Sequence, residues 1–216
     1  MNLITFGCSY TQGIGLEDVY PETNKISKLA WPQKLADLIG CTVTNLGWGG
    51  SSNKKILHNI LKHDYNTNDV VVVCWTHTDR WCVIKEDEIL DVGIWQWPDS
   101  RKYDGTTVTY DFETTKRSQV FFEHLHDEND MLLQMQRDIQ LAKYWLDKRN
   151  IKNYHFSVSI NEYFKKYEKW FDVKLLNIDF KKLTKSSPAV DNSHPNWQAQ
   201  ETVAKNIIEL TEGLSI

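Results

Sequence analysis

The chain has 216 residues, of which 41% are hydrophobic and 25% charged, with a formal net charge of −4. This length and composition suit a single α/β domain over residues 1–216 with its own core. Acidic and basic residues are interspersed, and there is no basic stripe of the kind that a phosphate backbone requires, so nucleic acid is not an expected partner.

The four cysteines form no CxxC pair, which indicates reduced thiols in a reducing compartment rather than a disulfide framework. The start of the chain, MNLITFG, lacks the basic and long apolar regions of a signal peptide, and no stretch reaches the length of a membrane span. We therefore expect a soluble, cytoplasmic protein with no membrane partner. The oligomeric state stays open.

The first third of the chain alternates predicted strands and helices. Val70–Val73 is a β-branched run typical of a strand that is covered on both faces. Strands are predicted over 2–6, 41–46 and 69–75; helices are predicted from Trp31-Pro32 to Gly40 and after a cap at Ser51 or Ser52. This order indicates a parallel sheet with right-handed crossovers.

Residues 85–130 interrupt the alternation. This segment is polar and rich in aromatic residues, and Asp104-Gly105 predicts the turn of a β-hairpin. We interpret it as an insertion that acts as a lid or specificity element. Beyond it, the pattern predicts a helix over 131–149, a strand over 155–160, a helix over 163–171, a short strand over 173–178 and a closing helix over 196–212.

Polar residues follow each of the first three predicted strands. Ser9 follows the first, residues 47–53 the second and residues 76–80 the third. Ligands of open parallel α/β sheets bind outside the carboxyl ends of the strands, so these residues are expected to meet. A serine nucleophile there would need a base, a carboxylate that orients the base, and donors for an oxyanion.

Asp191 and His194 have a spacing that fits the base and its orienting carboxylate. A tight turn over Asp191–Pro195 can bring the carboxylate to Nδ1 of His194 and leave Nε2 free to face a serine. The alternative is a turn with a capping Asp and a surface His.

Three motifs occur in order along the chain: FGCSYTQG over 6–13, NLGWGG over 45–50 and DNSHP over 191–195. Together they resemble the first, second and fifth sequence blocks of the SGNH (GDSL-type) hydrolases. The resemblance implies a three-layer α/β/α sandwich with a flavodoxin-like parallel sheet. It also implies a nucleophile at Ser9, a general base and acid at His194, an orienting carboxylate at Asp191, and oxyanion donors at the N–H groups of Ser9 and Gly50.

The third block departs from the family pattern. Where the family has Gly-x-Asn-Asp, with the Asn side chain as a third oxyanion donor, this chain has Thr76-His77-Thr78-Asp79. Thr78 therefore stands at the Asn position with a shorter donor, and Asn53 or His77 could substitute for it. In the first block Cys8 replaces the usual Asp; a cysteine nucleophile is the alternative there, but neighbouring side chains seldom point the same way.

The remaining polar and aromatic candidates concern binding. His77 and Asp79 have no further partner at ligand spacing, so no metal is expected, and no cofactor is implied. Asp79 and Arg80 are expected to form an ion pair, with Arg80 alternatively receiving an anionic group of a substrate. The candidate substrate-binding residues are Asn53, His77, Arg80 and Trp48. Several tryptophans are expected to line an aromatic cleft: Trp48, Trp75, Trp81, Trp95 and Trp97.

The function that these features favour is hydrolysis of a carboxylic ester through an acyl-Ser9 intermediate. The substrate would be a small molecule or a glycan ester, with an O-acetylated carbohydrate as the specific expectation. Two alternatives remain: an inactive SGNH scaffold that binds without turnover, and an acyltransferase that uses the same residues.

Overall fold

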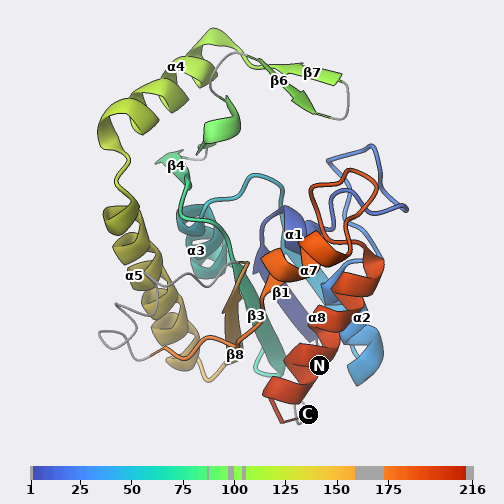
Figure 1. The fold of residues 1–216 in the computed structure, drawn as a ribbon. Helices are drawn as coiled ribbons and strands as arrows, with labels where there is room; N and C mark the ends of the chain where they lie inside the picture. The colour runs from blue at the N-terminus through green and yellow to red at the C-terminus, as the bar shows by residue number, and fades with distance from the viewer. Residues whose placement is uncertain (1, 87, 97–99, 104–105, 159–172, 213–216) are drawn as a thin grey trace.

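The computed structural model describes residues 2–86, 88–96, 100–103, 106–158 and 173–212 (Figure 1). In chain order the elements are β1 (Asn2–Gly7), α1 (Ser9–Gln12), α2 (Trp31–Ile39), β2 (Thr42–Gly47), α3 (Asn53–Lys62), β3 (Asp69–Trp75), β4 (Arg80–Lys85), β5 (Glu88–Gly93), η1 (Ile94–Gln96), β6 (Ser100–Tyr103), β7 (Thr106–Thr109), α4 (Phe112–Val120), η2 (Phe121–Leu125), α5 (Glu128–Asp147), β8 (Lys152–Ser157), α7 (Phe180–Ser186) and α8 (Trp197–Leu210).

The central sheet is parallel and has the strand order β2-β1-β3-β8. Strand β3 is buried along its whole length and lies between β1 and β8, which explains its unbroken apolar sequence. The flavodoxin-like order and the parallel pairing confirm the α/β fold expected from the sequence.

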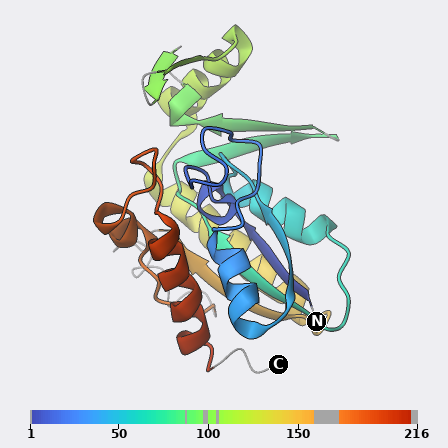
Figure 2. The ribbon, with the colours of Figure 1, turned by 90° about the vertical axis from the view of Figure 1, so that its right-hand side faces the viewer.

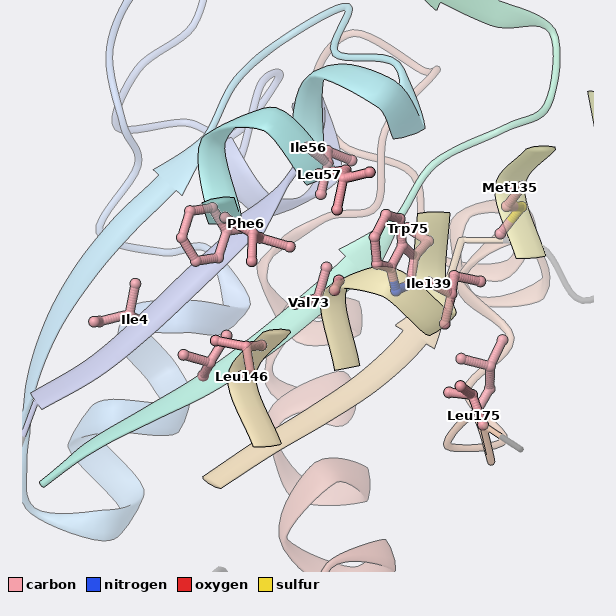
Figure 3. Packing of buried hydrophobic residues seen from close by; sticks show 14 of the residues in the cluster. Ile4, Phe6, Ile56, Leu57, Val73, Trp75, Met135, Ile139, Leu146 and Leu175 are labelled. Atoms are coloured by element: carbon pink, nitrogen blue, oxygen red, sulfur yellow. The ribbon is translucent and has the colours of Figure 1, made fainter. Parts of the chain in front are cut away.

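Helices α3 and α5 cover one face of this sheet (Figure 1). Ile56 and Ile60 of α3 pack with Ile139 and Leu146 of α5 over Val73 of β3, and Figure 3 shows part of this cluster. Each aliphatic side chain buried in this way contributes about 1.5–3 kcal/mol relative to an exposed one.

Helices α2, α7 and α8 cover the opposite face, which completes the three layers. Trp31 and Leu35 of α2 pack with Val203 and Ile207 of α8. The side-chain carbonyl of Gln200 accepts a hydrogen bond from the backbone N–H of Trp31 at 3.0 Å, so the first turn of α2 is tied to α8.

The segment between β3 and α5 lies above the carboxyl ends of the strands (Figures 1 and 2). It contains two antiparallel strand pairs, β4–β5 and β6–β7. The pairing of β6 with β7 confirms the predicted hairpin, although its turn residues 104–105 lie outside the described residues. Trp81 stacks on Phe121 with ring centroids 4.9 Å apart. Lys55 of α3 bonds Asp91 of β5 at 2.7 Å and so ties this segment to the main body.

Several boundaries differ from the sequence-based expectations. Residues 173–178 are not a strand; Leu176 N–H donates one bond to His155 C=O at 2.8 Å. The fourth sheet strand is Lys152–Ser157, earlier than predicted, and the predicted helix over 163–171 lies outside the described residues. The short helices α1 and α7 were not predicted. Within the described ranges, no helix has the length and apolar character needed to cross a membrane.

Candidate active site

Ser9 is the first residue of α1, immediately beyond the carboxyl end of β1. Ser9 as a whole is only 4% exposed. The neighbouring Cys8 is fully buried in the cluster formed by α2, α8 and the sheet. The cysteine therefore packs into the core, which disfavours it as the nucleophile.

Asp191 and His194 are joined by a short hydrogen bond between Oδ2 and Nδ1, at 2.5 Å. The other carboxylate oxygen accepts the backbone N–H groups of Ser193 and His194, each at 3.0 Å. Asn192, between them, has a φ of 57°, a left-handed conformation that Asn tolerates. This local turn orients the imidazole as the sequence spacing predicted. Asp191 also caps the turn, as in the alternative, but the His194 side chain is only 14% exposed and is therefore not a surface His.

Long-range contacts hold this turn beside the segment that follows Ser9. Val190 N–H donates to Gly15 C=O at 3.2 Å, and Gln200 Nε2 donates to Tyr10 C=O at 3.3 Å. The ring of Tyr10 lies 5.4 Å from that of His194, centroid to centroid. The imidazole is therefore brought next to the residue that follows Ser9 in the chain.

Gly50 lies in the loop after β2, with a φ of 77° that favours glycine. A Cβ at this position would lie 3.5 Å from the indole carbon Cζ2 of Trp95, so Trp95 of η1 stands directly beside the loop. Trp95 thereby joins the insertion to the candidate site. The sequence pointed to it only as one of several aromatic residues.

Gln12 is a buried residue of this region to which sequence reasoning assigned no role. Its side-chain oxygen accepts the N–H of Gly49 at 2.6 Å, and its Nε2 donates to the C=O groups of Thr23 and Lys25, both at 2.9 Å. It therefore ties α1 to the glycine loop after β2. The available signal was its place in the FGCSYTQG motif.

Asn53 holds the backbone at the end of β3. Its Oδ1 accepts Thr76 N–H at 2.8 Å and its Nδ2 donates to the C=O groups of Thr76 and His77, at 3.2 and 3.5 Å. The amide is thus engaged within the protein, which favours a positioning role over the substrate contact expected from the sequence. Thr78, the residue at the family's Asn position, is half-buried.

The ring of His77 lies 6.2 Å from that of Tyr10, centroid to centroid. Burial first, and then the charge of Arg80, lower the pKa of His77 from 6.5 to about 4. Its imidazole is therefore neutral near pH 7 and keeps one N–H donor and one acceptor nitrogen.

The expected ion pair between Asp79 and Arg80 is wrong. Oδ1 of Asp79 and both Nε and Nη1 of Arg80 are buried without a hydrogen-bond partner among the described residues. Instead, the guanidinium lies over the ring of Trp95, 5.0 Å from its centroid. Asp79 lies in the turn before β4 and Arg80 is the first residue of that strand, so being neighbours in the sequence does not pair the two side chains.

The tryptophans that the structure describes do not all line one cleft. Trp75 is fully buried in the core, and Trp97 lies outside the described residues. Trp48 is 44% exposed and lines a groove of about 640 Å³ along α3. The described residues lining that groove do not include Ser9, Asp191 or His194, so this groove is not the site formed by those residues.

The described part of the chain contains no group of three His, Cys, Asp or Glu residues arranged to hold a metal ion. The candidate polar groups near the carboxyl end of β1 are Ser9, the Asp191–His194 pair beside Tyr10, and the backbone N–H groups of the loops. This set can perform proton transfer and nucleophilic attack without a bound ion.

Comparison with known proteins identifies the fold. No protein-family model and no curated protein matches the chain. Among solved structures, an acetyl xylan esterase from Butyrivibrio proteoclasticus is 13% identical with a TM-score of 0.55, covering 96% of this chain and 62% of its own. The esterase EstA from Pseudoalteromonas sp. is 11% identical with a TM-score of 0.51, covering 98% of this chain and 96% of its own. A lipolytic protein of the G-D-S-L family from Desulfitobacterium hafniense is 9% identical with a TM-score of 0.50, and the match covers 97% of this chain and 98% of that one. The chain therefore has the SGNH-hydrolase fold.

Proposed function

We propose that this protein hydrolyses carboxylic esters, with Ser9, His194 and Asp191 as its catalytic triad. The observation that carries the proposal is the Asp191–His194 hydrogen bond, presented beside the residue that follows Ser9. The esterases among the structures of the same fold support ester hydrolysis as the reaction class.

In the acylation step, Oγ of Ser9 attacks the ester carbonyl carbon while Nε2 of His194 takes the hydroxyl proton. Asp191 holds the proton on Nδ1 and stabilises the imidazolium that forms. The tetrahedral oxyanion accepts hydrogen bonds from the backbone N–H groups of Ser9 and Gly50. His194 then returns the proton to the leaving alcohol, and the C–O bond of the ester breaks.

In the deacylation step, a water molecule gives its proton to His194 and attacks the acyl carbon. The bond to Oγ of Ser9 breaks, His194 reprotonates the serine, and a carboxylic acid leaves. Thr78 or the neutral His77 is proposed as the third donor, in place of the Asn of the family pattern. Asn53 would act on these residues by fixing the backbone that carries them.

The specific substrate proposed is a small ester or an O-acetyl group on a carbohydrate. Trp95, next to Gly50, offers an aromatic face against which a sugar ring can stack. Trp48 is not part of this proposal, since it lines a groove whose described lining lacks the triad residues.

The test is labelling of the purified protein by a fluorophosphonate, read by intact mass, followed by an assay with p-nitrophenyl acetate. We expect one adduct per chain, and no adduct in Ser9→Ala. The matched control is Ser186→Ala, an exposed serine of α7, which should label like the wild type.

Two results would redirect the proposal. A folded protein with neither labelling nor turnover would favour the inactive binding scaffold. Labelling accompanied by ester product whenever an acceptor alcohol is present, but by little hydrolysis, would favour an acyltransferase.

A further inference from the structure

Part of the Arg80 guanidinium is buried without hydrogen-bond partners, although the residue as a whole is half-buried. Its Nε and Nη1 lack a hydrogen-bond partner, and no carboxylate of the described residues neutralises its charge; Oδ1 of Asp79, next in the chain, is itself unpartnered. A buried charged donor without a partner is expensive, and in native proteins it calls for an explanation such as a ligand.

Arg80 also lies at the candidate active site. Its guanidinium stands over the ring of Trp95, and the same indole lies against Gly50, the proposed oxyanion residue. Arg80 further acts electrostatically on His77 and Tyr10, both of which flank the site.

The charges around this position favour an anion. The positive charge of Lys181 in α7, like that of Arg80, lowers the pKa of His77. The carboxylate of Asp191 already forms a hydrogen bond with His194. The described carboxylate that acts on His77 is that of Asp79, and it forms no ion pair with Arg80.

We propose that Arg80 binds a carboxylate carried by the ester substrate, so that the enzyme prefers esters bearing a negative charge near the scissile bond. This proposal rests on the proposed ester hydrolysis. A guanidinium stacked on an indole is pre-organised and donates in a plane that matches a carboxylate. Nε and Nη1 are covered in the free protein, and a shift of the covering Trp95 side chain would expose them to the ligand.

The experiment compares two matched ester pairs. In the first, 3-acetoxybenzoate and its methyl ester differ by a charge in the leaving group. In the second, monoethyl glutarate and ethyl valerate differ by a charge in the acyl group. We expect the wild type to prefer the charged member of at least one pair by 10-fold or more in kcat/KM.

Two substitutions test whether Arg80 is the source of that preference. Arg80→Gln should lower kcat/KM for the charged ester by about 10- to 100-fold, mainly through KM, and change the neutral ester less than threefold. Arg80→Lys should keep part of the preference, because the charge remains but the planar donor set is lost. The control is Lys85→Gln, an exposed cation at the far end of the same strand, which should leave the preference unchanged.

Absence of any preference in the wild type would overturn the proposal, as would equal losses for both members of a pair in Arg80→Gln. A binding measurement separates this outcome from failure of the hydrolase function. Calorimetry on Ser9→Ala and on Ser9→Ala/Arg80→Gln, with 3-acetoxybenzoate and its methyl ester, reads carboxylate recognition without turnover. If 3-acetoxybenzoate binds in an Arg80-dependent way but the wild type is never labelled by the fluorophosphonate, the carboxylate site is supported and the proposed ester hydrolysis is rejected.

Discussion

The carboxylate of Asp191 lies directly against Gly15: a Cβ built on Gly15 would stand 2.5 Å from both Cγ and Oδ2 of Asp191. Gly15 also has a φ of 83° and accepts a hydrogen bond from Val190. One glycine in the loop after α1 therefore sets the position of a side chain 176 residues further along the chain, because a methyl group there would occupy the carboxylate's space.

Gly15→Ala is expected to displace Asp191 and to lower kcat by at least about 10-fold, since a small misplacement of a catalytic group is costly. Gly40→Ala is the matched control: Gly40 has a φ of 70°, but nothing lies within 4 Å of its Cβ position. Both variants carry the left-handed backbone cost of about 1–2 kcal/mol. A comparable loss of kcat in both would show that the Asp191 contact is irrelevant; thermal melts and ester assays measure the two effects.

Asp191→Asn is expected to lower kcat by about four powers of ten, the effect of this change in a serine-protease triad, because the amide holds the wrong tautomer of the base. Asp179→Asn, at the N-cap of α7, serves as the control, since this carboxylate accepts the backbone N–H of Lys182 and an Asn can cap the helix in its place. Esterase kinetics with p-nitrophenyl acetate check the prediction. Near-wild-type activity of Asp191→Asn would remove this residue from the mechanism.

Gln12→Ala is expected to slow fluorophosphonate labelling and to reduce kcat by about 10- to 100-fold, because Gly49 and the 23–25 segment lose their shared anchor. Gln12 is a positioning residue, and so the loss should fall on kcat more than on KM. Gln119→Ala removes an exposed hydrogen bond from Gln119 of α4 to Glu123 of η2 and should leave both labelling and kcat unchanged. Unchanged labelling in a folded Gln12→Ala protein would show that the loop after β2 does not need this anchor.

Acid is expected to destabilise the protein before most carboxylates are protonated. Burial lowers the pKa of His155 to about 3 and that of His77 to about 4, against 6.5 for an ordinary histidine. The unfolded chain therefore binds more protons than the folded one below about pH 6.5, and stability falls as the pH drops from there toward 4. Each such histidine contributes a slope of up to about 1.4 kcal/mol per pH unit.

His155→Gln tests the larger of these contributions. In the folded protein Nδ1 of His155 accepts from Nε1 of Trp75 at 3.1 Å and Nε2 bonds Oδ1 of Asn153 at 2.9 Å, two partners that a glutamine amide can keep. Urea unfolding between pH 7 and 4.5 should show a shallower loss of stability in the variant. Parallel curves for variant and wild type would mean that His155 is not the group responsible.

The sequence by itself determined the features that depend on near neighbours. The β-branched run at 70–73 specified a buried strand, Pro32 and Gly40 bracketed α2, and the three-residue spacing of Asp191 and His194 specified their hydrogen bond. The alternation of predicted strands and helices indicated a parallel sheet, and the resemblance of the three motifs to the SGNH hydrolases implied the three-layer fold. These are effects of backbone propensity and short-range hydrogen bonding, which the local residues control.

The tertiary structure alone decided which distant groups meet. It placed Asp191 against Gly15, engaged Asn53 with the end of β3, and stacked Arg80 on Trp95 instead of pairing it with Asp79. Sequence adjacency misled in the last case, because Asp79 lies in the turn before β4 while Arg80 is the first residue of that strand and lies over Trp95. Such contacts depend on how loops from separate crossovers pack above the sheet, and the free energy of that packing is shared among residues that no local pattern connects.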